Sequence, residues 1–170
     1  MIIRPILLDE IDTLRQLAIR TYSAAFASKN RPGVIEAYYA SAFTVPKLTQ
    51  ELEDSNAHWY FASVNSDIVG YLKLNVDRSQ TEFQEHDGIE LERIYVDVGN
   101  LNKGYGEQLL NFAISKGRGL RKKYIWLGVW EENPDAIRFY KRHGFKITGT
   151  HDYNMTAEIQ TDYIMRLDLL

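Results

Sequence analysis

The sequence predicts an α/β or α+β protein in which helices cover both faces of a central sheet. Apolar residues alternate with polar ones in some stretches and recur every three or four positions in others, which separates strands from helices. Two strand–helix units follow one another over residues 89–121 and 124–142, after a predicted hairpin over residues 59–76. This order of elements is typical of a sheet with helices packed on it. The length of 170 residues fits one domain, residues 1–170.

The N-terminal part of the chain is expected to form a short strand and three helices. Residues 2–6 are apolar enough for the strand, and Asp9 can cap the first helix. The segment Asn30-Arg31-Pro32-Gly33 breaks helices, so the first helix should end before it. The predicted helices run from Asp9 to before residue 30, over residues 35–43, and from Pro46 to near Asp54.

The rest of the chain contains the hairpin, the two strand–helix units and two final strands. Asn65-Ser66-Asp67 is a turn-forming triplet between the strands of the hairpin. The last two strands are expected to be antiparallel neighbours. The predicted strands cover residues 59–64, 68–76, 89–96, 124–130, 145–150 and 163–169, and the predicted helices cover residues 104–121 and 134–142.

Composition and charge exclude several classes of function. The chain has 20 Lys and Arg against 23 Asp and Glu, a net charge of −3, which gives no global reason to expect nucleic-acid binding. It has no Cys, so disulfides, thiolate nucleophiles and Cys-ligated zinc are impossible. The apolar start, residues 1–8, is too short for a signal peptide or a membrane span, which predicts a cytoplasmic protein with no membrane partner. The histidines lack a metal-ligand spacing, so no metal site and no catalytic role is assigned to His58, His86, His143 and His151.

A glycine pair lies at the first strand–helix junction. Gly104 and Gly106 come directly before a predicted helix, where free backbone N–H groups and the helix dipole favour a phosphate. Such a pair can equally be only a tight turn. Leu109 stands where a dinucleotide-binding motif has its third glycine, and the Gly-Lys-Ser/Thr of a P-loop is absent, so neither of those folds is expected.

The second junction places Asn133 at a helix start and Tyr140 seven residues later on the same helix face. Alone, these residues would be a helix cap and a packed ring. Together, however, the two junctions resemble the signatures of the GNAT superfamily, the acyl-CoA-dependent N-acetyltransferases. Residues 101–106 match its Gln/Arg-x-x-Gly-x-Gly pyrophosphate motif, and residues 133–145 match its Asn-x-x-Ala-x-x-Phe-Tyr-x-x-x-Gly-Phe element.

The resemblance extends over essentially the whole chain. Residues 91–96, 125–131 and 160–165 look like the bacterial PaiA-type spermidine/spermine N-acetyltransferases. This resemblance implies the GNAT fold, with a mixed and mostly antiparallel sheet of six to seven strands, helices on both faces and a V-shaped splay between the fourth and fifth strands. It also implies a homodimer. The chain departs from the family at Leu101, where the motif has Gln or Arg, and we expect a weakened CoA site there.

The resemblance also implies acetyl-CoA as the cosubstrate and no metal. Backbone N–H groups at the end of the strand over residues 89–96 would polarise the acetyl carbonyl, Asn133 would hydrogen-bond the pantetheine arm, and Tyr140 would protonate the leaving thiolate. Lys103 and Arg138 are expected to neutralise phosphate charge. The residues expected to bind CoA are Ile94, Tyr95, Val96, Leu101, Asn102, Lys103, Gly104, Tyr105, Gly106, Glu107, Asn133, Arg138 and Tyr140.

An amine substrate needs a proton acceptor, because an alkylammonium has a pKa near ~10.4 and is almost fully protonated at neutral pH. Glu90 and Glu92 alternate onto one strand face with Ile94 and Val96, so either carboxylate can face the cleft. Polyamine acetyltransferases favour the position of Glu92 and other GNAT enzymes that of Glu90, so the assignment stays open. Both could also simply solvate an exposed strand face.

The acceptor is predicted from charge. Residues 77–92 hold six carboxylates and a single Arg or Lys, which would attract a polycation. We therefore expect acetyl transfer to a small-molecule amine, a polyamine such as spermidine or spermine, by direct attack in a ternary complex. The alternatives are another amine (a protein N-terminus, lysine or an aminoglycoside) or a degenerate CoA-sensing module. The residues expected to bind the acceptor are Tyr38, Glu85, Asp87, Glu92 and Trp130.

Overall fold

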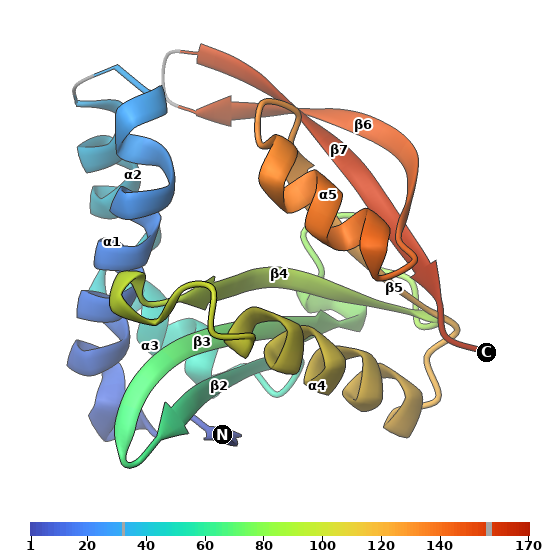
Figure 1. The fold of residues 1–170 in the computed structure, drawn as a ribbon, viewed down its shortest axis with the longest axis horizontal. Helices are drawn as coiled ribbons and strands as arrows, with labels where there is room; N and C mark the ends of the chain where they lie inside the picture. Colours follow the sequence, from blue (N-terminus) through green and yellow to red (C-terminus); the bar gives the residue numbers. More distant parts are fainter. Residues whose placement is uncertain (32, 156–157) are drawn as a thin grey trace.

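A computed structural model of the chain describes residues 1–31, 33–155 and 158–170 (Figure 1). Seven strands form one sheet in the order β1-β2-β3-β4-β5-β7-β6. The strands are β1 (Ile2–Pro5), β2 (Ala57–Val64), β3 (Asp67–Val76), β4 (Gly88–Val96), β5 (Tyr124–Trp130), β6 (Lys146–Met155) and β7 (Glu158–Asp168). The helices are α1 (Ile11–Phe26), α2 (Val34–Ala42), α3 (Val45–Glu53), α4 (Tyr105–Gly119) and α5 (Pro134–Arg142).

The predicted elements are all present, with differences at their ends. Asp9 does not cap α1, because it lies in a short 3₁₀ turn over Leu8–Glu10 that precedes the helix. The final hairpin is longer than predicted, since β6 continues to Met155 and β7 already begins at Glu158. Its distal residues are mostly polar and lack the alternation that indicates a strand, but their backbones pair. Of the predicted helix breaker, Pro32 lies outside the described residues.

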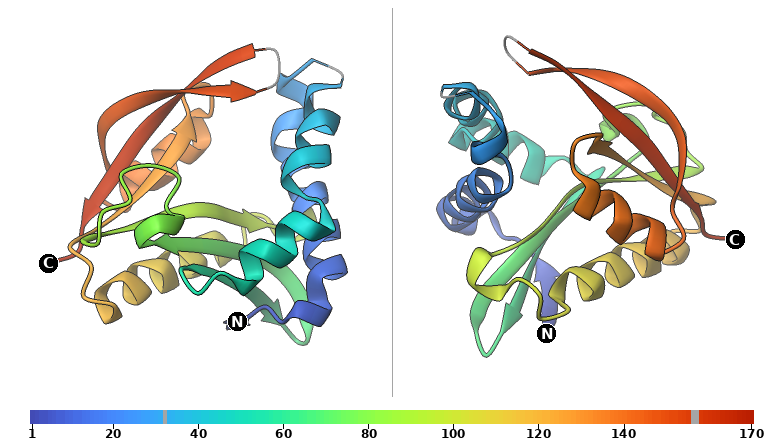
Figure 2. Two further views of the ribbon diagram at one scale, coloured as in Figure 1. Left: turned by 180° about the vertical axis from the view of Figure 1, so that it is seen from behind. Right: turned by 45° about the horizontal axis from the view of Figure 1, so that its top comes forward.

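Two hydrophobic cores lie on opposite faces of the sheet, which confirms that helices cover both faces. One core packs α4 and α5 against the sheet, and the other packs α1, α2 and α3 against β2 and β3. Figures 1 and 2 show α4 and α5 on one side and α1 with α2 along the opposite side. Within the described residues, no helix is long and apolar enough to cross a membrane.

The parallel pair β4 and β5 separates soon after it begins. The two strands pair only at Gly88↔Tyr124, Ile89↔Ile125 and Glu90↔Trp126, although β4 continues to Val96 and β5 to Trp130. All other strand pairs in the sheet are antiparallel. The mixed sheet and the splay between its fourth and fifth strands are therefore as predicted (Figure 2).

An irregularity in β4 changes which side chains share a face. The register with β3 passes from Lys73↔Arg93 to Leu74↔Leu91, so Glu92 is an extra residue, as in a β-bulge. Before it, Ile89 and Leu91 pack toward α4; after it, Ile94 and Val96 do so. The prediction that Glu90 and Glu92 share a face with Ile94 and Val96 is therefore wrong, because the extra residue shifts the alternation.

Candidate active site

A cleft of about 940 Å³ opens where β4 and β5 separate. One end is bordered by the loop before α4 and by one face of α5, and the other end by α1, α2 and the β6–β7 hairpin. Because β5 has moved away, backbone groups of β4 at Ile94, Tyr95 and Val96 that do not pair with β3 point into the opening. The splay thus exposes unpaired N–H and C=O groups in the middle of the cleft.

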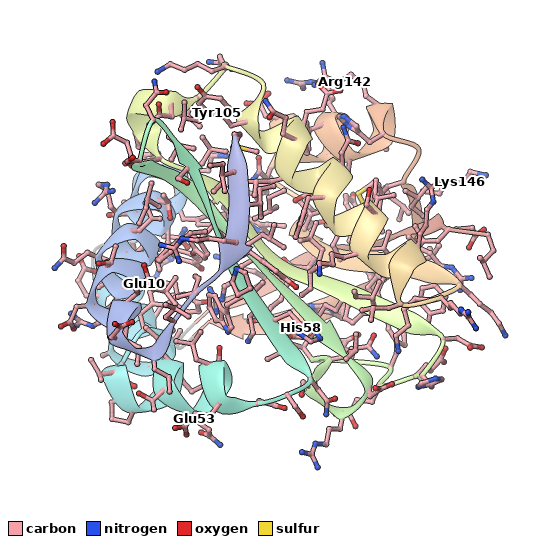
Figure 3. All side chains as sticks on the ribbon, turned by 90° about the horizontal axis from the view of Figure 1, so that it is seen from below. Glu10, Glu53, His58, Tyr105, Arg142 and Lys146 are labelled. Atoms are coloured by element: carbon pink, nitrogen blue, oxygen red, sulfur yellow. The ribbon has the colours of Figure 1, made fainter. Side chains whose placement is uncertain are left out.

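The start of α4 forms a concave backbone surface at one end of the cleft. Gly104 precedes the helix with φ +79°, a left-handed conformation that favours glycine, and Asn102 also has a positive φ of 59°. The first N–H groups of α4, at Tyr105, Gly106 and Glu107, have no intrahelical acceptor. A Cβ at Gly106 would lie 3.9 Å from the nearest side-chain atom, and none lies within 4 Å at Gly104, so the backbone can be approached closely. Figure 3 shows Tyr105 at this helix end.

The two charged residues predicted to contact the phosphates, Lys103 and Arg138, do not line the cleft. Lys103 does not line the cleft, since its ammonium donates to the Gly99 carbonyl (2.9 Å) and the Asn100 side chain (3.1 Å). Arg138 is ion-paired with Asp135 on the exposed side of α5 and does not line it either. Arg142, which the sequence did not single out, does line the cleft.

Asn133 and Tyr140 lie together on the α5 wall of the cleft. Asn133 caps α5, because its Oδ1 accepts a hydrogen bond from the Ala136 N–H (3.3 Å), and its Nδ2 has no partner among the described residues. Tyr140 is 9% exposed, and this burial raises the pKa of its phenol well above the ordinary value. Tyr140 is therefore protonated at neutral pH, as an ordinary phenol also is, although the raised pKa makes it a weaker acid.

Glu92 is held between two cations. Its Oε2 lies 2.6 Å from the Lys73 ammonium and its Oε1 lies 3.3 Å from the Arg93 Nε. Burial alone would raise the pKa of Glu92, but Arg93 and Lys73 outweigh it and hold this pKa below the ordinary value. Glu92 is thus held in its charged form, which makes it a poor proton acceptor.

The hydrogen-bond partners of Glu90 among the described residues are all neutral. The Thr81 hydroxyl donates to its Oε1 (2.5 Å), and the Thr81 N–H (2.8 Å) and the Asn75 amide (2.9 Å) donate to its Oε2. The side chain is 3% exposed and lines the cleft. Burial, and then the charge of Glu92, raise the pKa of Glu90 above its ordinary value despite these hydrogen bonds. A raised pKa makes Glu90 the better general base of the two.

Of the three carboxylates predicted for the acceptor, Glu92 lines the cleft but Glu85 and Asp87 do not. Glu85 accepts a hydrogen bond from the Tyr124 hydroxyl (2.6 Å) and Asp87 is paired with Lys123 (2.6 Å); neither lines the cleft. Glu82 and Asp162 line it instead.

His151 lies between these two new carboxylates. Its Nδ1 is 2.8 Å from Glu82 and its Nε2 is 3.8 Å from Asp162. Register across three strands puts Trp130, Asp162 and His151 in one row. No local pattern could indicate His151, because no motif links β6 to the loop that carries Glu82.

Aromatic rings close the cleft beside these carboxylates. Tyr38 stacks on Tyr22 with ring centroids 4.4 Å apart, and its hydroxyl accepts a hydrogen bond from Arg93 (3.1 Å). The ring centroids of Trp130 and Phe26 lie 6.3 Å apart across the opening. Tyr38 and Trp130, both predicted for the acceptor site, thus lie on the cleft wall, and Tyr38 also packs in the core under α1.

The family model described as the acetyltransferase (GNAT) family matches residues 12–145. The chain belongs to the acetyltransferase (GNAT) family. It is therefore an acetyltransferase, and the resemblance of its two junction motifs is confirmed.

Relatives of this GNAT chain agree with the assignment. An uncharacterized N-acetyltransferase of Lactobacillus delbrueckii subsp. lactis is 34% identical over 150 residues, which are 88% of this chain and 87% of that protein. The spermine/spermidine N(1)-acetyltransferase of Bacillus subtilis is 32% identical over 108 residues, 61% of this chain and 71% of that protein. The crystal structure of PaiA N-acetyltransferase from Thermoplasma acidophilum in complex with coenzyme A has a TM-score of 0.80 at 22% identity and covers 98% of both chains. This likeness shows the same fold.

Proposed function

We propose that this GNAT enzyme transfers the acetyl group of acetyl-CoA to a primary amine of a polyamine such as spermidine or spermine. One observation carries the proposal. A single cleft joins an anion-attracting helix start at one end to carboxylates and aromatic rings at the other. An anionic thioester donor suits the first end, and a polycationic amine suits the second. The polyamine acetyltransferases among the relatives agree with this choice.

The helix start at Gly104 fits the phosphates of CoA, because its backbone is open and its first N–H groups have no intrahelical acceptor. The Nδ2 of Asn133 is available to the pantetheine arm, and the unpaired groups of β4 at residues 94–96 are available to the acetyl carbonyl. Leu101 is 51% exposed at the cleft and brings neither a charge nor a hydrogen-bond donor. CoA would therefore be held mainly by backbone groups.

We propose that Glu90 accepts the proton of the attacking ammonium, directly or through a water molecule. The base must be charged to act, and its raised pKa makes it a stronger acceptor than an ordinary glutamate. Glu92 would keep the site anionic without taking the proton, because Lys73 and Arg93 hold it in the charged form. Tyr140 would donate its phenolic proton to the sulfur as the C–S bond breaks, and the second proton of the attacking nitrogen would restore the phenol through solvent. Acetyl-CoA itself supplies the thioester that the amine attacks, so the reaction needs no acyl-enzyme and no metal.

The proposal is tested by following CoA release with a thiol-reactive dye, which meets no protein background because the chain has no Cys. Acetyl-CoA is supplied with spermidine, spermine, putrescine, a lysine peptide or an aminoglycoside. We expect turnover with spermidine or spermine and little with the peptide. Turnover with the peptide or the aminoglycoside alone would contradict the polyamine proposal, and intact CoA binding without any turnover would indicate a sensing module.

Two matched variants test the acceptor end of the cleft. Asp162→Asn removes a carboxylate that lines the cleft, whereas Asp87→Asn removes one that is paired with Lys123 outside it. We expect Asp162→Asn to raise the KM for spermidine about tenfold, as for loss of a partly screened ion pair, and Asp87→Asn to leave it unchanged. Equal effects of the two variants would mean that the whole acidic loop, rather than the cleft, attracts the amine.

We also propose a cytoplasmic homodimer, because the absence of Cys favours the cytoplasm and the resemblance to the family favours a dimer. Size-exclusion chromatography with light scattering tests the second part, and a mass twice the 19.7 kDa of one chain is expected.

A further inference from the structure

Asn75 lies on β3 beside both glutamates of the cleft. It is fully buried, and its Cα is paired in register with that of Glu90. Its Nδ2 donates to the Oε2 of Glu90 (2.9 Å) and also to the Oε2 of Glu92 (2.6 Å). A side-chain amide has two hydrogens, so each carboxylate receives one. The proposed reaction gives this residue no task.

The bulge in β4 is what allows one amide to reach two carboxylates. In a regular strand, residues 90 and 92 would be separated by two positions along one face. Here the extra residue at Glu92 brings its carboxylate back toward Asn75, while Glu90 stays opposite in register. Two adjacent carboxylates repel each other, and a shared donor reduces that repulsion by stabilising both anions.

The orientation of the Asn75 amide is fixed by these two acceptors. Its Oδ1 is buried and has no hydrogen-bond partner in the part of the chain that the structure describes. A flipped amide would turn this oxygen toward two carboxylates and would lose both hydrogen bonds. A buried unpaired acceptor is uncommon in folded proteins and calls for an explanation. The two donated hydrogen bonds provide one.

We propose that Asn75 is a positioning residue that assigns different tasks to the two glutamates, since it donates one hydrogen to each and so keeps Glu90 aligned and ready to accept a proton. The role assumes the proposed function in taking Glu90 as the base. Glu92 has Lys73 and Arg93 in addition and remains charged without Asn75. Apart from Asn75, Thr81 is the one described residue that donates to Glu90, so the loss of Asn75 affects Glu90 more than Glu92.

The charged and titratable groups of this cluster come from several elements. Glu92 and Arg93 lie on β4, Lys73 lies on β3, and Glu51 of α3 is paired with Lys73 (2.7 Å). Thr81 comes from the loop before β4, and Trp126 is the partner of Glu90 on β5. Among these groups, the neutral donors Asn75 and Thr81 lower the pKa of Glu90, whereas Glu92 raises it. Loss of the Asn75 donor should therefore raise that pKa.

The test uses Asn75→Leu, which has a similar shape and no donor, and Thr81→Val as the matched variant. Thr81→Val removes a donor to Glu90 alone, while Asn75→Leu removes donors to both glutamates.

Carboxyl carbons of ¹³C-labelled glutamate are titrated by NMR in the free protein, with Glu90→Gln and Glu92→Gln to assign the signals. We expect Asn75→Leu to raise the Glu90 pKa by about one unit, the size of a lost hydrogen bond to a charged group, and to move the Glu92 signal as well. Thr81→Val should move Glu90 only.

The pH dependence of kcat/KM with spermidine is the second readout, and its rising limb should move to higher pH in Asn75→Leu by the same amount. A folded Asn75→Leu protein with an unmoved Glu90 titration would overturn the inference. If Asn75→Leu does not fold, Asn75→Ser takes its place, because it keeps one donor for the two acceptors. We expect Asn75→Ser to raise the Glu90 pKa by a smaller amount, and an unchanged pKa would contradict the inference. A shifted Glu90 titration without polyamine turnover would support the role of Asn75 and contradict the proposed function. Polyamine turnover without a shifted titration would support the proposed function and contradict the role of Asn75.

Discussion

Glu90→Gln removes the proposed proton acceptor while leaving the size of the side chain unchanged. General-base catalysis contributes about 10²–10⁴-fold to turnover. Glu92 is a poor replacement, because Arg93 and Lys73 hold its pKa below the ordinary value. We therefore expect Glu90→Gln to lower kcat at pH 7.5 about 100-fold or more. CoA affinity should stay the same, since Glu90 lies away from the start of α4.

Glu92→Gln is the matched control, because it makes the same chemical change two residues along the strand. Breaking a buried ion pair costs about 3–5 kcal/mol, and here the lower end applies because Lys73 keeps Glu51 as a partner. For a domain of this size, about 3 kcal/mol lowers Tm by roughly 6–12 °C. Glu90→Gln should not lower Tm. A carboxyl whose pKa is raised by folding destabilises the folded state at neutral pH, so removal of its charge is neutral or stabilising.

The assay combines thermal unfolding at pH 7.5 with CoA release measured from pH 4.5 to 9. In the wild type, the rising limb of kcat/KM should include the ionisation of Glu90, at a pH above that of an ordinary glutamate. In Glu90→Gln, the rising limb should no longer contain the ionisation of Glu90 and should reflect only the deprotonation of the amine substrate. A stable, inactive Glu92→Gln together with a nearly wild-type Glu90→Gln would refute the division of roles.

Four further substitutions test other parts of the cleft. Tyr140→Phe should lower kcat at least tenfold with CoA affinity unchanged, and equal turnover in the two proteins would remove the acid role. Gly104→Ala should weaken CoA binding measured by calorimetry and cost about 1–2 kcal/mol in stability, because its φ is +79°; unchanged values of both would contradict the helix-start site. Leu101→Arg should tighten CoA binding several-fold by adding a phosphate partner, and unchanged affinity would place the phosphates elsewhere. Gly128→Val should raise the KM for spermidine and not that for acetyl-CoA, because a Cβ there lies 3.5 Å from both Asp162 and His151; a rise in both constants would argue for a general distortion.

The order and type of the elements could be predicted because local patterns determine them. The Asn65-Ser66 turn has φ values of +50° and +72°, as hairpin turns require, and its residue types signal this. The N-terminus of α4 and the cap of α5 are likewise local, and the family motifs coincide with them. The polar ends of β6 and β7 could not be predicted, because only their mutual pairing makes them strands.

The parts of the site that lie at a strand–helix junction could be predicted from the sequence. The parts that depend on how strands pair in the sheet could not. Gly104, Asn133 and Tyr140 follow from short motifs. The separate roles of Glu90 and Glu92 depend on the bulge in β4 and on Lys73, a partner that is distant in sequence. The row of Trp130, Asp162 and His151 depends on the register of three strands.

The arrangement of charges at the acceptor end depends on loop conformation. Glu82 faces the cleft while its neighbours in the acidic loop, Glu85 and Asp87, bond elsewhere. Charge counting along the loop predicts an anionic region but not which carboxylates reach the cleft.

The most direct test of the central claim is CoA release by the wild-type protein with acetyl-CoA and spermidine, with the amine product identified by mass spectrometry. We predict CoA release that saturates with spermidine and a product heavier by one acetyl group. Release no faster than hydrolysis of acetyl-CoA alone, in protein that binds CoA, would contradict the claim that this cleft acetylates a polyamine.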